Sequence, residues 1–162
     1  MPDDRSVLIS MTSKALSGEG AHIKAIDVLA DLDWKLAGER PAGAPHSMFQ
    51  LVNHIAYWDR WAVNWLDGKK PKAPKHAAGS WPGKVKPASR REWDKAVRQL
   101  REASTALERR SRETDLLKKH GKTTRLEMLH TIGSHASYHV GQVAFLRQML
   151  GAWPPPSGGV TW

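Results

Sequence analysis

The chain has 162 residues, of which 40% are hydrophobic and 25% are charged, a composition typical of one ordinary globular domain. No apolar run is long enough to cross a bilayer, and residues 1–10 lack the basic start and apolar stretch of a signal peptide, so we expect a cytoplasmic protein without a membrane partner. Cysteine is absent, which excludes disulfides, a thiol nucleophile and thiolate metal sites. Any bound metal must therefore be held by His, Asp or Glu.

The net charge of +9 is concentrated in one segment, residues 68–91, which contains eight Lys or Arg residues and no acidic residue. Its four prolines and three glycines exclude a regular helix and predict a long surface connection. A nucleic-acid site needs basic residues on a rigid element or aromatic side chains interleaved for stacking, and only Trp81 interrupts this run. We therefore expect no nucleic-acid partner.

Four segments have helical periodicity and none alternates clearly with period two, so the sequence predicts an all-α domain. The first helix covers residues 5–17 and ends before Gly18. Residues 21–41 follow as a further helical piece or as two short turns, closed by Gly38 and Pro41. We expect a single domain over residues 1–162, with an extended, proline-rich tail at 152–162 whose Trp162 lies across the bundle.

The second long helix is predicted to begin after Ser47, a possible N-cap, and to end at Asp67 and Gly68. His54 lies beside its apolar stripe, which consists of Met48, Leu51, Ile55, Trp58, Ala62 and Trp65. Trp58 is four residues from His54 and is a candidate wall of a site there.

A third helix is expected over residues 90–112, capped by Ser89, with Trp93, Val97, Leu100, Ser104 and Leu107 facing inward. The last helix begins near Thr123 or Thr124, where Glu127 completes a capping box, and ends at Gly151. Its inward positions are Met128, Ile132, His135, His139, Val143, Leu146 and Leu150.

Two histidines of this last helix, His135 and His139, differ by about 40° around the helix axis, so both rings leave one face. This spacing allows one helix to supply two ligands to one metal, as in HExxH, although the glutamate of that motif is missing here. A catalytic site of this kind takes three protein ligands and one open position, and His54 is the best-placed third ligand. Gln142 is a candidate to orient a ligand ring or to hold a bound water.

Hydrogen bonding between core histidines is the alternative interpretation of the pair. Buried imidazoles need polar partners, since leaving each one unpaired costs about 1–3 kcal/mol. Spacing alone leaves both interpretations open. The remaining histidines are less well placed, because His130 faces elsewhere on its helix and because His22, His46, His76 and His120 lie in loops or near helix ends.

The stretches NHIAYW (53–58) and HASYHVGQVAFLRQMLGAW (135–153) resemble the DinB-like family, also described as the YfiT-like metal-dependent hydrolase group. Its pattern is one histidine in the second bundle helix and H-xxx-H-xGQ in the last, which this chain matches at His54, His135, His139 and Gln142. The resemblance covers most of the chain. It implies a four-helix bundle with a long crossover, a divalent metal such as nickel or zinc on the three histidines plus water, and a homodimer.

Two hypotheses for function follow. In the first, the chain is an enzyme acting on a small-molecule substrate, whose metal activates water for hydrolysis or a low-molecular-weight thiol cosubstrate for transfer. Relatives in the family include thiol-dependent transferases and proteins described as hydrolases, so the fold does not choose between these reactions. In the second, the chain is a non-catalytic binding module whose basic segment 68–91 recruits an anionic partner.

Overall fold

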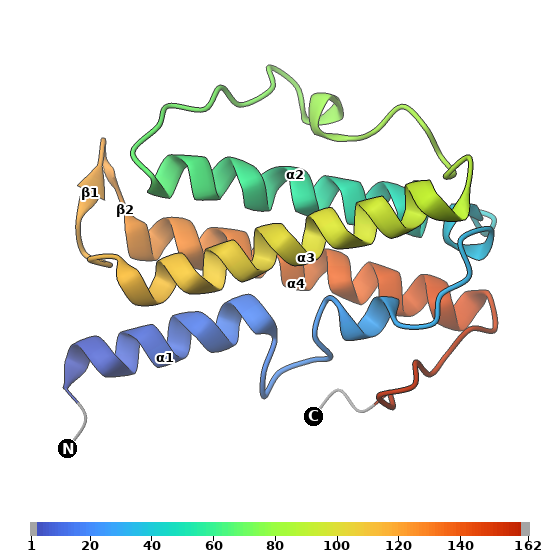
Figure 1. Cartoon of the computed structure of the whole chain (residues 1–162), viewed down its shortest axis with the longest axis horizontal. Coiled ribbons are helices and arrows are strands. Elements are labelled where there is room, and N and C mark those ends of the chain that lie inside the picture. Colours follow the sequence, from blue (N-terminus) through green and yellow to red (C-terminus); the bar gives the residue numbers. More distant parts are fainter. Residues whose placement is uncertain (1–2, 160–162) are drawn as a thin grey trace.

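A computed structural model describes residues 3–159, which contain four α-helices and one two-residue-per-strand hairpin (Figure 1). The helices are α1 (Asp4–Ser17), α2 (Met48–Leu66), α3 (Arg90–Glu113) and α4 (Arg125–Met149). The strands β1 (Lys119–His120) and β2 (Thr123–Thr124) pair antiparallel just before α4. The predicted all-α class is confirmed. The hairpin was not predicted, because two-residue strands are too short to produce an alternating pattern.

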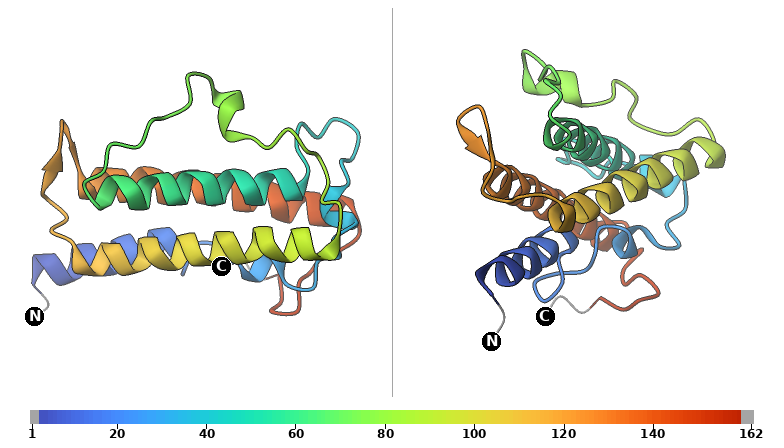
Figure 2. Two further views of the ribbon diagram at one scale, coloured as in Figure 1. Left: turned by 45° about the horizontal axis from the view of Figure 1, so that its top comes forward. Right: turned by 60° about the vertical axis from the view of Figure 1, so that its left-hand side comes forward.

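The helices form a bundle in which α2 contacts α3 and α4, and α1 also contacts α3 and α4. Helices α2 and α3 run in the same direction, opposite to α1 and α4 (Figure 1). The chain must therefore return along the whole bundle between α2 and α3, and residues 67–89 make this crossover. Both views in Figure 2 place the crossover beside α2, on the side away from α1. The predicted basic connection is this crossover.

The helix starts agree with the capping residues predicted from the sequence. Ser47 accepts a hydrogen bond from the backbone N–H of Gln50 at 3.2 Å, and the Gln50 side chain accepts one from the N–H of Ser47 at 3.1 Å. Thr124 and Glu127 form the same reciprocal pair at the start of α4. These local bonds satisfy backbone donors that the first helical turn leaves free, which explains why the boundaries were predictable.

The core is formed mainly by α2, α3 and α4. At some of the predicted inward positions, the neighbouring residue is the more deeply buried one. On α2, Trp65 is half-buried and packs against the core, while Leu66 is fully buried. On α4, Met128 and Leu129 show the same relation.

Residues 21–41 form two short 3₁₀ turns, Asp27–Leu29 and Leu36–Gly38, the second of the two predicted alternatives. Arg147 of α4 holds this segment in place. Its buried guanidinium donates hydrogen bonds to the carbonyl oxygens of Val28 at 2.7 Å and Ala30 at 2.9 Å, and its Nε donates to Ala152 at 2.8 Å. One side chain thus ties both the first connection and the start of the tail to the bundle.

One acidic side chain, Asp59 of α2, lies inside the bundle and is only 2% exposed. Ser104 of α3 donates a hydrogen bond to its Oδ2 at 2.8 Å, and Oδ1 has no partner within residues 3–159. Burial raises the pKa of the Asp59 carboxyl to about 7. The sequence did not indicate this buried carboxyl, because an aspartate on a helix usually faces solvent.

The tail packs against the core through Trp153, which is partly buried there. The expected packing of Trp162 lies outside the described residues. Within residues 3–159, no helix combines the length and the apolarity that spanning a membrane requires.

Candidate metal centre

Three histidine rings from two helices converge inside the bundle. His54 comes from α2, and His135 and His139 come from successive turns of α4. The Nε2 atom of His135 lies 3.1 Å from Nε2 of His54 and 3.1 Å from Nε2 of His139. One ring nitrogen from each histidine lies within 4.8 Å of the others, so the three side chains could hold one metal ion.

Hydrogen bonds on the far side of two rings fix which nitrogen faces the centre. Nδ1 of His54 lies 3.2 Å from the carbonyl oxygen of Ser80, and Nδ1 of His139 lies 2.7 Å from Oε1 of Gln142. Both oxygens only accept, so both Nδ1 atoms carry the ring proton. In the neutral rings, Nε2 of His54 and Nε2 of His139 therefore direct lone pairs toward the centre, as ligand nitrogens do.

The third ring cannot satisfy both of these lone pairs. A neutral His135 has one N–H, so its Nε2 can donate to His54 or to His139 but not to both. If Nε2 carries the proton, Nδ1 has none, and this Nδ1 is buried without a partner within residues 3–159. In either tautomer, at least one of the two 3.1 Å contacts thus brings two ring nitrogens together with no proton shared between them. A cation between the rings removes this repulsion, so the donor set fits a metal better than it fits a hydrogen-bonded core.

The protonation states agree with this donor set. Burial lowers the pKa of His54 and of His135 to about 4, and it also lowers the pKa of His139. The three rings are therefore neutral at pH 7, the form in which imidazole binds metals. Within residues 3–159, no carboxylate joins the cluster, so the three nitrogens leave coordination positions open.

The crossover is attached to α2 by polar side chains on one face of that helix. The Ser47 hydroxyl donates to the carbonyl oxygen of Val85, and the Gln50 amide donates to that of Pro82 at 3.2 Å. The bond from His54 to Ser80 continues the series one turn further along. Residues 47, 50 and 54 share one face because their spacing is three and four. This attachment brings the crossover over the three-histidine cluster.

Trp81 of the crossover lies between two imidazole rings. It stacks on His54 with ring centroids 3.8 Å apart and on His46 with centroids 3.6 Å apart. Trp58 lies edge to face against both His54 and His135, as expected for a wall of the site. The sequence did not indicate the roles of Trp81 and His46, because both lie in irregular segments that periodicity does not place.

Gln142 and Tyr138 lie beside His139. The Gln142 side chain bonds to His139, as predicted, and donates from Nε2 to the Tyr138 hydroxyl at 3.4 Å. Tyr138 is 66% exposed. His22 lies apart from the centre, where it bonds to Ser137 at 2.8 Å, and His130 is exposed on α4, as its predicted direction required.

The DinB superfamily profile matches residues 22–143, well over half of the chain. The chain belongs to the DinB superfamily. In this DinB-superfamily protein, the matched region contains α2, α3 and most of α4, together with all three histidines of the candidate centre. The suspected family is thus confirmed. Searches of curated proteins and of solved structures found no match.

Proposed function

We propose that this DinB-superfamily protein is a metal-dependent enzyme whose divalent ion is held by His54, His135 and His139. The observation that carries the proposal is the set of three neutral Nε2 atoms directed at one point, two of them fixed by hydrogen bonds at Nδ1. Nickel and zinc are the candidate ions, since imidazole suits both. When bound, such an ion lowers the pKa of a nucleophile and polarises the electrophilic centre of a substrate.

The protein's own residues position and shield this chemistry. Ser80 and Gln142 hold two ligand rings in orientation through their Nδ1 atoms. Trp81 and Trp58 cover the His54 side of the centre. With water as nucleophile the reaction is a hydrolysis. With a low-molecular-weight thiol it is a transfer, and the thiol must come as a cosubstrate because the chain has no cysteine.

Metal analysis of untagged protein, purified without added metal, tests the proposal. We expect about one equivalent of a transition metal in the wild type and its loss in His54→Ala and His139→Ala. His130→Ala is the matched control, because His130 lies on the same helix as His139 but is exposed. A wild-type protein that contains no metal and takes up neither zinc nor nickel would contradict the proposal.

The binding-module alternative predicts different behaviour. Lys69, Lys70 and Lys72 are exposed on the crossover, so a triple Lys→Gln variant would remove salt-sensitive binding of an anionic partner. The metal proposal predicts that this variant keeps its metal, because none of the three lysines belongs to the centre. Partner binding that depends on the lysines and is indifferent to His139→Ala would favour the alternative.

A further inference from the structure

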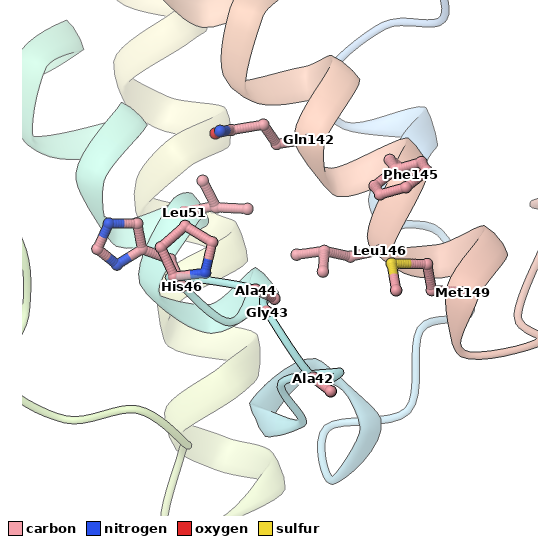
Figure 3. A pocket seen from close by; sticks show the side chains of 10 residues that line it. Ala42, Gly43, Ala44, His46, Leu51, Gln142, Phe145, Leu146 and Met149 are labelled. Atoms are coloured by element: carbon pink, nitrogen blue, oxygen red, sulfur yellow. The ribbon is translucent and has the colours of Figure 1, made fainter.

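Figure 3 shows a pocket of about 280 Å³, which is lined in part by Gln142, the residue that bonds to His139 of the candidate metal centre. Its walls come from α4, from Leu51 of α2 and from residues 42–46, which lead into α2. Figure 3 shows Phe145, Leu146 and Met149 along the α4 side, with Gln142 at one end. None of the ten lining residues is acidic, lysine or arginine. The interior of the pocket therefore suits an uncharged apolar group.

Two chains of contacts connect the pocket to the histidine rings. Gln142 lines the pocket, and its Oε1 lies 2.7 Å from Nδ1 of His139. His46 also lines the pocket and stacks on Trp81, which in turn stacks on His54. A molecule in the pocket would thus lie against Gln142, which orients His139, and against His46, which is one ring removed from His54. This is the place for the non-reacting part of a substrate.

The size of the pocket limits the ligand. A cavity of about 150 Å³ holds benzene, so this pocket of about 280 Å³ holds a group of roughly six to ten carbon atoms.

We infer that the substrate carries an uncharged apolar group of this size and that the pocket binds this group. That the bound molecule is a substrate rests on the proposed function, but the binding itself requires no metal. Hexan-1-ol is therefore a suitable probe, because it has the predicted apolar length and lacks a charge and a chelating group.

The test is an NMR titration of hexan-1-ol with metal-free and zinc-treated protein. We expect the same affinity for both forms and binding about tenfold tighter than that of butan-1-ol, since each buried methylene strengthens binding up to about fourfold. Hexylammonium should bind at least about tenfold more weakly than hexan-1-ol, because the pocket contains no group to pair with a charge. Hexanoate that binds as tightly as the alcohol would overturn the inference in favour of an acid paired with Arg40, which bonds to the Pro45 carbonyl oxygen.

Two variants locate the binding. Ala44→Phe fills the pocket from its loop side and should weaken hexan-1-ol about tenfold or more, whereas Ala73→Phe, on the exposed crossover, should not change it. If Ala44→Phe does not fold, Phe145→Ser replaces it, because Phe145 is 60% exposed and its loss removes one apolar wall. Unchanged affinity in the folded pocket variant would overturn the inference.

The outcomes separate the two proposals. If hexan-1-ol does not bind but metal analysis succeeds, the pocket inference is wrong and the proposed function stands. If hexan-1-ol binds in the pocket but the protein takes up no metal, the proposed function fails and the pocket remains a binding site for an uncharged apolar molecule.

Discussion

The indole of Trp81 lies parallel to the imidazole of His54, with an angle of 5° between the two planes. Trp81 belongs to the crossover and His54 to α2, so the orientation of one candidate ligand ring depends on a segment distant in sequence. We expect Trp81→Ala to lower metal affinity about tenfold or more, because groups that orient ligand rings contribute on this scale. Competition with a chelator measures the loss. Trp81→Phe keeps an aromatic face and should retain most of the affinity; equal losses in both variants would show that stacking is not the cause.

The bond between His139 and Gln142 leads to a second prediction. Gln142→Leu removes the acceptor at Nδ1 of His139 and should weaken metal binding about 10- to 100-fold. Gln142→Glu keeps an acceptor and should maintain or strengthen binding. Gln148→Leu, at an exposed position of the same helix, is the control. In metal-free protein, the ¹⁵N chemical shifts of His139 should show a change of ring tautomer in Gln142→Leu and in no other of these variants.

The pH dependence of stability provides a third prediction, for the metal-free protein. Burial lowers the pKa of His54 and His135 to about 4, whereas both rings titrate near 6.5 when unfolded. Between these values the unfolded chain binds more protons, so the histidine contribution to the free energy of unfolding falls as the pH decreases from about 6.5 to 4. Urea unfolding across this range should show that the free energy of unfolding falls less toward acid pH in His135→Asn than in the wild type. His130→Asn, at an exposed position, should leave this fall unchanged.

The titration of Asp59 changes the free energy of unfolding in the opposite direction. Burial raises its carboxyl pKa from 3.8 to about 7, so the folded state binds more protons than the unfolded state between these values. This contribution to stability is present below about pH 4 and is lost as the pH rises through 7. Asp59→Asn should therefore be more stable than the wild type at pH 8, by up to about 4 kcal/mol, and nearly equal to it at pH 4. Urea unfolding at both values checks this; the exposed Asp94→Asn should change little at either.

Two glycines of α4 should respond differently to the same substitution. A Cβ at Gly133 would lie 3.0 Å from the backbone oxygen of Ala15 in α1, whereas a Cβ at Gly141 would meet nothing within 4 Å. Gly133→Ala should destabilise the protein by about 1–3 kcal/mol, because α1 and α4 must separate. Gly141→Ala should stabilise it by up to about 1 kcal/mol, through helix propensity alone. Thermal or urea unfolding measures both effects. A gain in stability in Gly133→Ala would show that α1 can move away from α4 without loss of stability.

Local patterns were sufficient for the helices and for part of the site. The capping bonds of Ser47 and Thr124 act within one helical turn, so the starts of α2 and α4 were predicted correctly. The contact between His135 and His139 follows from their spacing on one helix, and the bond from His139 to Gln142 spans three residues. Helix geometry links sequence separation to distance in all of these cases.

Contacts between elements were not predictable in the same way. Trp81, Ser80 and His46 reach the centre only because the crossover is attached to α2, and no period in the sequence relates residues 46 and 81. The burial of Asp59 and the pocket beside Gln142 likewise depend on how α2, α3 and α4 pack. By itself the sequence determined the helices and the candidate ligands, because those follow from local geometry. Only the tertiary structure decided how the ligand rings are oriented and what lies beside them, because both depend on non-local packing.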